Sequence, residues 1–225
     1  MNDSLDKLIN PVWYSLSEAQ KEYTLDFGDT KFYQPVYAAF GSFNRDCDPI
    51  AIQKYAQLTS KFLMVGEEPL LPNSVKLNKK LEGVQMLIEN SIHFAIEEEI
   101  VHLTSYHLPE LLELVALVYP AYYQPKTFYL GDYYGIFKNN KLVAITGERM
   151  QMDAFVEISA VITHPDYTGR GYAKQLVAHT VNKIIAKNKT PFLHTESYNV
   201  GAIGLYNKLG FRKCRNMNFW ILERR

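Results

Sequence analysis

The feature that most constrains the fold is a glycine-rich turn placed between a strand pattern and a helix pattern. The run FVEISAVIT at 155–163 is apolar and rich in β-branched residues, which favours a buried strand. The run YAKQLVAHTVNKIIAK at 172–187 places apolar residues at helical spacing. Gly169 and Gly171 lie between the two runs, on either side of Arg170. The sequence therefore predicts a strand that enters a helix through a glycine turn.

A turn of this kind can hold a phosphate group. The first N–H groups of a helix are unpaired and carry partial positive charge, and glycine lets an anion approach them closely. A tight turn that binds nothing is the alternative. A P-loop is excluded, because the chain contains no G-x-x-x-x-G-K-[ST] string.

The dinucleotide-binding fingerprint G-x-G-x-x-G is matched only in its first two glycines. Lys174 stands in place of the third glycine, and the segment HPDYT separates the glycines from the strand. Glu196 ends the next predicted strand, where a ribose-binding acid would lie. A dinucleotide site therefore stays an alternative with an incomplete motif.

The rest of the second half alternates hairpin-forming strands with helices. Asn139 and Asn140 separate two apolar runs, which indicates a two-residue hairpin. The expected elements are a helix at 108–120, strands at 133–138, 141–150, 155–163 and 191–196, helices from 171 and at 199–210, and a terminal hairpin of 211–214 with 218–223. This order predicts an α/β (α+β) fold with a mixed, mostly antiparallel central sheet flanked by helices.

The first half predicts a smaller α/β region. We expect a helix near 17–24, a strand near 31–34, a helix at 48–58, strands at 61–65 and 82–88, and a loop at 67–80. Asp48 should be the N-cap of the helix at 48–58, with Pro49 at the first helical position. The composition changes near 97–106, so we expect two domains, 1–100 and 101–225.

Composition limits the class of protein. The 225 residues are 47% hydrophobic, and 24 Lys and Arg balance 24 Asp and Glu, so nothing points to a nucleic-acid or membrane partner. Cys47 and Cys214 lack metal-ligand spacing, and we expect both to be buried thiols in a reducing compartment. The start lacks a signal-peptide pattern, and no apolar stretch is long enough to span a bilayer. We expect a soluble cytoplasmic protein.

Two sequence blocks together resemble the GNAT superfamily of N-acetyltransferases over about 105–225. The segment TGRGYA at 168–173 resembles the family's coenzyme A loop, [Q/R]-x-x-G-x-[G/A], with Thr168 as the one departure. The segment NVGAIGLYNKLGF at 199–211 is similar to the family's second block, N-x-x-A-x-x-x-Y-x-x-x-G-F. The amino-acid sequence of this region is most similar to the FR47-like branch, which also supplies the C-terminal half of glycine N-acyltransferases. The resemblance implies the GNAT acyltransferase fold.

The resemblance also implies a reaction. Acetyl-CoA and a primary amine would meet in one ternary complex, and the amine would attack the thioester directly, with no metal. The residues implied to bind the cosubstrate through their backbone are Val161, Ile162 and Thr163 along the pantetheine arm, and Gly169, Arg170, Gly171, Tyr172 and Ala173 around the pyrophosphate. A catalytically silent acyl-CoA-binding or sensor protein on the same scaffold is the alternative function.

Three side chains are candidates for further roles. Tyr206 would protonate the departing thiolate, or it packs in the core. Asn199 would cap its helix, bond the pantetheine, or do both. Glu157 interrupts an apolar strand and would act as the catalytic base, with a pKa raised by partial desolvation. A structural pair with Arg149, or a solvated face, is the alternative for Glu157.

The remaining predictions concern weaker candidates and the first half. His164 is expected to cap or pack, whereas His194, Glu148 and Arg149 are candidates for the border of the acceptor site. The first half carries no recognisable catalytic motif. A degenerate GNAT-like repeat is one reading of it, and its expected role is to wall the acceptor site or to mediate a homodimer.

Overall fold

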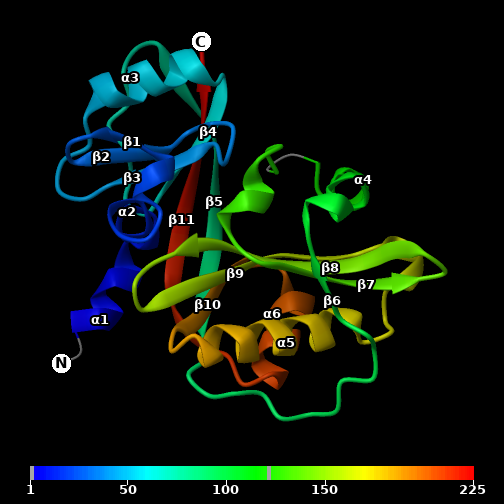
Figure 1. Cartoon of the computed structure of the whole chain (residues 1–225). Coiled ribbons are helices and arrows are strands. Elements are labelled where there is room, and N and C mark those ends of the chain that lie inside the picture. The colour runs from blue at the N-terminus through cyan, green and yellow to red at the C-terminus, as the bar shows by residue number, and fades with distance from the viewer. Residues whose placement is uncertain (1–2, 121–122) are drawn as a thin grey trace.

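Eleven strands of the computed structural model form one curved sheet within residues 3–120 and 123–225, which are the residues the structure describes (Figure 1). The order is β1-β2-β3-β4-β11-β5-β10-β9-β8-β7-β6. The β3/β4 and β9/β10 pairs are parallel and the others antiparallel, so the predicted mixed sheet is confirmed. The strands are β1 Thr24–Phe27, β2 Thr30–Tyr33, β3 Phe40–Phe43, β4 Lys61–Val65, β5 Val75–Leu87, β6 Val101–Leu103, β7 Tyr133–Lys138, β8 Lys141–Gln151, β9 Phe155–Thr163, β10 Thr190–Glu196 and β11 Arg212–Arg224.

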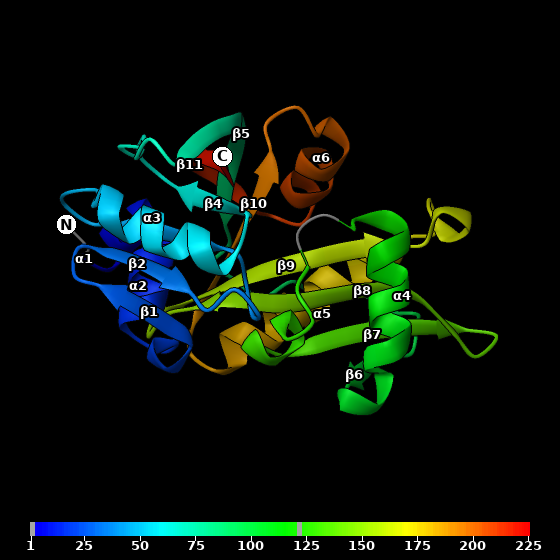
Figure 2. The same cartoon turned by 90° about the horizontal axis from the view of Figure 1, so that it is seen from above.

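Helices cover both faces of this sheet. Helices α4 and α5 lie on opposite faces of β7, β8 and β9, and α3 covers the N-terminal strands (Figures 1 and 2). The helices are α1 Asp3–Asp6, α2 Pro11–Ser17, α3 Pro49–Leu58, α4 Leu108–Val118, α5 Tyr172–Ala186 and α6 Val200–Lys208. Short 3-10 turns are η1 Lys7–Ile9, η2 Lys21–Tyr23, η3 Ser105–His107, η4 Thr127–Leu130 and η5 Pro165–Tyr167. No helix among the described residues is long and apolar enough to cross a membrane.

The C-terminal strand joins the two halves of the chain. Strand β11 lies between β4 and β5, both from the first hundred residues. The predicted terminal hairpin is therefore wrong: 212–224 is one strand with irregularities, and both neighbours satisfy its backbone groups. The predicted loop at 67–80 is also too long, because β5 begins at Val75. Its exposed lysines hid the strand pattern. The division into two domains stays a prediction.

The N-terminal helix begins earlier than its predicted position. Helix α2 spans Pro11–Ser17, with Pro11 at its first position and the Asn10 side chain accepting from Trp13 N at 3.2 Å. The chain then makes only the η2 turn before β1, so the helix predicted near 17–24 is wrong. The Asp48 cap is confirmed, since its carboxylate accepts from Ile50 N at 2.9 Å.

Several local predictions at single residues have clear outcomes. Asn139 and Asn140 have φ of 52° and 60°, which confirms the tight β7–β8 hairpin. Cys47 and Cys214 are free but only half-buried, so their predicted full burial is wrong. Partial burial raises the pKa of both thiols.

Strands β9 and β10 diverge partway along their length. Their parallel pairing runs from Phe155↔Thr190 to Ile158↔Leu193 and stops there. Beyond that point β9 pairs with β8 alone, and β10 pairs with β5. Ala160, with φ of 50°, and Val161 form a bulge in β9 at this split. After Ile158, the edge of β9 that faced β10 has no neighbouring strand among the described residues.

Candidate functional site

The glycine turn between β9 and α5 has the geometry that its sequence predicts. Gly169 and Gly171 have φ of +75° and +77°, and Gly171 is the N-cap of the 15-residue helix α5. Apart from the glycine's own chain neighbours, no atom of the described residues lies within 4 Å of an ideal Cβ at either position. The left-handed backbone, rather than crowding, is what requires glycine here, and it leaves open space above the turn.

The backbone N–H groups of 169–174 are free to donate to a bound anion. Within the part of the chain that the structure describes, none of them donates to a protein acceptor. The first helical bond at this end is that of Gln175 N to Gly171 O, at 3.1 Å. The Arg170 guanidinium donates to Asp166 O at 3.1 Å and lies over the Tyr167 ring, so the preceding turn is held in place.

The preceding turn also contains His164, which caps η5. Its Nδ1 accepts from Asp166 N at 3.2 Å, as predicted for a capping residue. Its Nε2 contacts Lys141 Nζ at 3.0 Å. His164 therefore holds the loop through the hydrogen bond that its Nδ1 accepts, and it does not line the cavity described below.

A cavity of about 540 Å³ lies where β9 and β10 diverge. Six of the residues singled out from the sequence line it: Arg149, Val161, His194, Glu196, Asn199 and Tyr206. Residues of β3, β4, β5 and β11 also line it, among them Phe40, Lys61, Leu63, Glu82, Phe219 and Ile221. The structure thus brings predicted site residues of the second half against side chains of the first.

Sequence reasoning expected the first half to wall an acceptor site or to mediate a homodimer, but it named no residue for either role. Phe40 and Lys61 belong to short strands without a catalytic motif, so no local signal marks them. Their place follows from tertiary packing. Gln20 Nε2 donates to Arg149 O at 2.8 Å and Ser15 Oγ donates to Gln151 O at 2.9 Å, which fastens the N-terminal segment to β8.

Tyr206 lies on α6 with its side chain buried against the cavity. It is 6% exposed and its ring packs against Phe211 at 5.7 Å. Its hydroxyl has no hydrogen-bond partner among the described residues, and burial raises its pKa to about 12. At neutral pH the phenol therefore keeps its proton. Asn199 caps the same helix, since its Oδ1 accepts from Ala202 N at 3.0 Å.

Glu157 is buried in an ion pair at the base of the cavity. Arg149 Nε and Nη2 donate to its two oxygens, each at 2.7 Å, and His194 Nδ1 lies 2.8 Å from Oε1. Burial alone would raise the pKa of Glu157, but the charge of Arg149 and the hydrogen bonds from His194 and Arg149 lower it to about 2. The raised pKa expected from the sequence is wrong, because the strand neighbours supply a cation.

The contacts of His194 define its tautomer. Its Nε2 lies 3.1 Å from Gln85 Nε2, which can only donate, so the imidazole Nε2 accepts and Nδ1–H donates to Glu157. Gln85 Nε2 also donates to Leu8 O at 2.8 Å. His194 thus borders the cavity with both ring nitrogens occupied, and its place at an acceptor site stays a prediction.

Glu148 does not border the cavity. Its buried carboxylate is 3.1 Å from Lys187 Nζ, which also contacts Asp132 at 2.7 Å. Burial raises the pKa of Glu148 against the opposing effect of Lys187. Adjacent residues on a strand face opposite sides, which places Glu148 and Arg149 in different surroundings.

Comparison with known proteins shows which family and which structures this chain is similar to. Residues 133–221 match the family model described as FR47-like protein. A structure from Novosphingobium aromaticivorans, assigned to the acetyltransferases of the GNAT family, is 29% identical over 97% of this chain and 98% of that chain, with a TM-score of 0.87. Comparison with curated proteins finds no match. Nothing in these matches bears on glycine N-acyltransferases, so that resemblance stays a prediction.

More distant structures share the fold. A GCN5-related N-acetyltransferase-like protein from Streptococcus suis is 14% identical over 99% of this chain and 97% of its own, with a TM-score of 0.63. A GCN5-related N-acetyltransferase from Kribbella flavida is 11% identical over 100% and 96% of the two chains, with a TM-score of 0.62. The chain therefore has the GNAT acetyltransferase fold, and its residues 133–221 match the FR47-like family model.

Proposed function

We propose that this protein is an N-acyltransferase that transfers an acetyl group from acetyl-CoA to a primary amine. The observation that carries the proposal is the row of backbone N–H groups at 169–174, which have no protein acceptor among the described residues and stand at the start of a long helix. A pyrophosphate satisfies such donors and the helix dipole at once. The family and the fold support an acyltransferase.

The divided sheet supplies a place for the rest of the cosubstrate. After Ile158, β9 still pairs with β8 on one edge, but its other edge has no strand beside it in the described chain. The backbone of that free edge can therefore pair with the pantetheine arm. We assign Val161, Ile162 and Thr163 to this role. A backbone N–H of this segment would polarise the thioester carbonyl. Asn199 serves as the cap of α6, and its side chain also borders the cavity.

The reaction needs three changes in bonding. The amine nitrogen forms a bond to the acyl carbon, the carbon–sulfur bond of the thioester breaks, and the amine loses a proton as the thiolate gains one. Tyr206 is proposed to give the thiolate its proton, because its phenol stays protonated at neutral pH and its hydroxyl is unpaired in the described chain beside the cavity.

The role of Glu157 as base stays a prediction from the sequence. Its contacts support the other hypothesis, an ion pair with Arg149 that shapes the base of the cavity. A carboxylate with a pKa of about 2 is a weak proton acceptor at neutral pH. Kinetics of the Glu157→Gln variant against pH distinguish the two roles.

Thermal-shift measurements with acetyl-CoA, CoA and NAD(P) test the proposed function. A ligand raises apparent stability by RT ln(1 + [L]/Kd), so acetyl-CoA and CoA should raise the melting temperature and NAD(P) should not. Stabilisation by NAD(P) alone would contradict the proposal. Release of CoA thiol with an amine panel separates the enzyme from a silent acyl-CoA sensor. The cytoplasmic location and the homodimer stay predictions.

A further inference from the structure

Arg149 has hydrogen-bonding capacity that the protein does not use. A guanidinium carries five N–H donors in a planar fork, and Glu157 takes one from Nε and one from Nη2. The remaining donors, those of Nη1 and the second of Nη2, have no acceptor among the described residues. The Arg149 side chain is 26% exposed and lines the cavity, whereas the Glu157 side chain is 1% exposed.

The unused edge of this guanidinium is held in a fixed orientation. Glu157 accepts two hydrogen bonds of 2.7 Å from one edge of the guanidinium. The Phe40 ring lies 5.1 Å from the Arg149 guanidinium carbon. The donors of Nη1 and Nη2 have the spacing that matches the two oxygens of a carboxylate. Little conformational entropy remains to be lost when an anion binds there.

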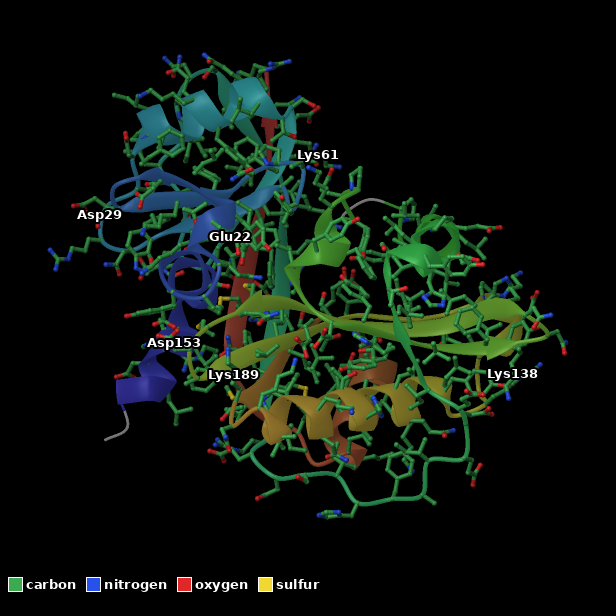
Figure 3. The ribbon with its side chains drawn as sticks, in the orientation of Figure 1. Glu22, Asp29, Lys61, Lys138, Asp153 and Lys189 are labelled. Carbon is green, nitrogen blue, oxygen red and sulfur yellow. The ribbon has the colours of Figure 1, made fainter. Side chains whose placement is uncertain are left out.

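The cavity is lined by charged residues of both signs besides Arg149. Lys61 on β4 is a second cation of the wall, on the side of the N-terminal strands that faces α4 (Figures 2 and 3). Glu82 on β5 and Glu196 on β10 line the cavity from the middle of the sheet. In the sheet order, β5 and β10 lie between β4 and β8, so the two acidic residues lie between the strands that carry Lys61 and Arg149.

Apolar side chains also line the cavity, together with uncharged polar residues such as Ser159 and Thr195. Leu63, Met150, Phe219 and Ile221 line the same cavity. An acceptor that fits such walls has an apolar body, with a cation at one end and an anion at the other.

We infer that the acceptor is a primary amine that also carries a carboxylate, and that the free edge of Arg149 binds this carboxylate. The inference rests on the proposed function and adds the acceptor class. The ion pair with Glu157 then has a purpose beyond stability, because it orients the guanidinium. Arg149 is in this account a specificity-determining residue, and the acidic residues at the middle of the sheet attract the amine.

The test uses acceptors that differ only in the carboxylate. Release of CoA thiol from acetyl-CoA is measured with the standard L-amino acids and with their α-carboxamides. At least one acid should be acetylated with a kcat/KM ten or more times that of its amide. Arg149→Lys keeps the charge beside Glu157 but loses the fork, so KM for the acid should rise about tenfold with kcat nearly unchanged. The preference for the acid should then disappear.

A matched control and a binding measurement keep the outcomes distinct. Arg212→Lys changes an exposed arginine paired with Glu89 outside the cavity, and it should keep the preference for the acid. Acetyl-CoA should raise the melting temperature of wild type and both variants equally. If it stabilises none of them, the proposed function fails and the inference fails with it. If it does but amides react as well as acids, or neither set reacts, only the acceptor inference is overturned.

Discussion

The glycine loop at 169–174 and the base of the cavity are two candidate sites of different construction. The loop is made of consecutive backbone groups at 169–174, and two left-handed glycines expose them. The base of the cavity is made of side chains from three strands, Arg149, Glu157 and His194, with Phe40 from a fourth. A site made of consecutive backbone groups is visible as a sequence motif. A site made of distant side chains becomes visible only when the sheet order is known.

The largest effect should come from a charge in the loop. Gly171→Glu places a carboxylate at the proposed phosphate site, where its charge repels the ligand. The φ of +77° at this position is also strained for a residue with a Cβ. We therefore expect acetyl-CoA binding to be lost. Gly28 has the same φ and equally open surroundings in a remote turn, which makes Gly28→Glu a matched control. Calorimetric titration should show binding to the control and none to Gly171→Glu. Equal affinity of both variants would place the phosphate elsewhere.

The second effect concerns a side chain that both the motif and the cavity single out. Tyr206→Phe removes only the hydroxyl, so kcat should fall by ~10²–10⁴-fold with little change in coenzyme affinity. Single-turnover kinetics with a reactive acceptor measure this. A kcat within about twofold of wild type would return Tyr206 to a packing role.

The third effect is on stability and belongs to the base of the cavity alone. Arg149→Met leaves the buried carboxylate of Glu157 without its cation, which typically costs ~3–5 kcal/mol. The double variant Arg149→Met/Glu157→Gln removes the uncompensated charge and should regain part of this loss. Urea unfolding at pH 7 gives both free energies. A single variant as stable as wild type would show that the pair is not coupled.

The fourth effect is a pH dependence. The pKa of Glu157 is lowered to about 2, below the ~4.3 of a free glutamate, so its contribution is present above pH ~4.3 and is lost as pH falls toward 2. Glu157→Gln should therefore cost about 2–3 kcal/mol at pH 7 and less at low pH. The free energy of unfolding of both forms against pH measures this. A cost that is constant with pH would contradict the ion-pair account.

The same variant also decides between scaffold and base. If Glu157 only holds Arg149, kcat/KM should fall by the same factor at every pH. A base would give the largest loss near neutral pH, and the loss would shrink as pH rises and more of the amine is already neutral. That second pattern would restore the catalytic role inferred from the sequence.

The elements predicted from sequence are those with local signals. Asp48 and the asparagine hairpin at 139–140 carry their own turn and cap chemistry, and both lie where expected. The strand at 75–80 was missed because its pairing with β11 spans most of the chain. Glu157 was found as an anomaly in an apolar strand, but the sign of its pKa shift depends on Arg149 and His194, which tertiary structure brings to it.

The most direct test of the central claim is the response of individual backbone amides to acetyl-CoA. If the N–H groups of 169–174 bind the pyrophosphate, their NMR resonances should shift more than any others when acetyl-CoA is added to saturation. Their hydrogen exchange should slow as well, because unpaired donors acquire an acceptor. Saturation with acetyl-CoA that leaves these amides unchanged, while others shift, would contradict the account.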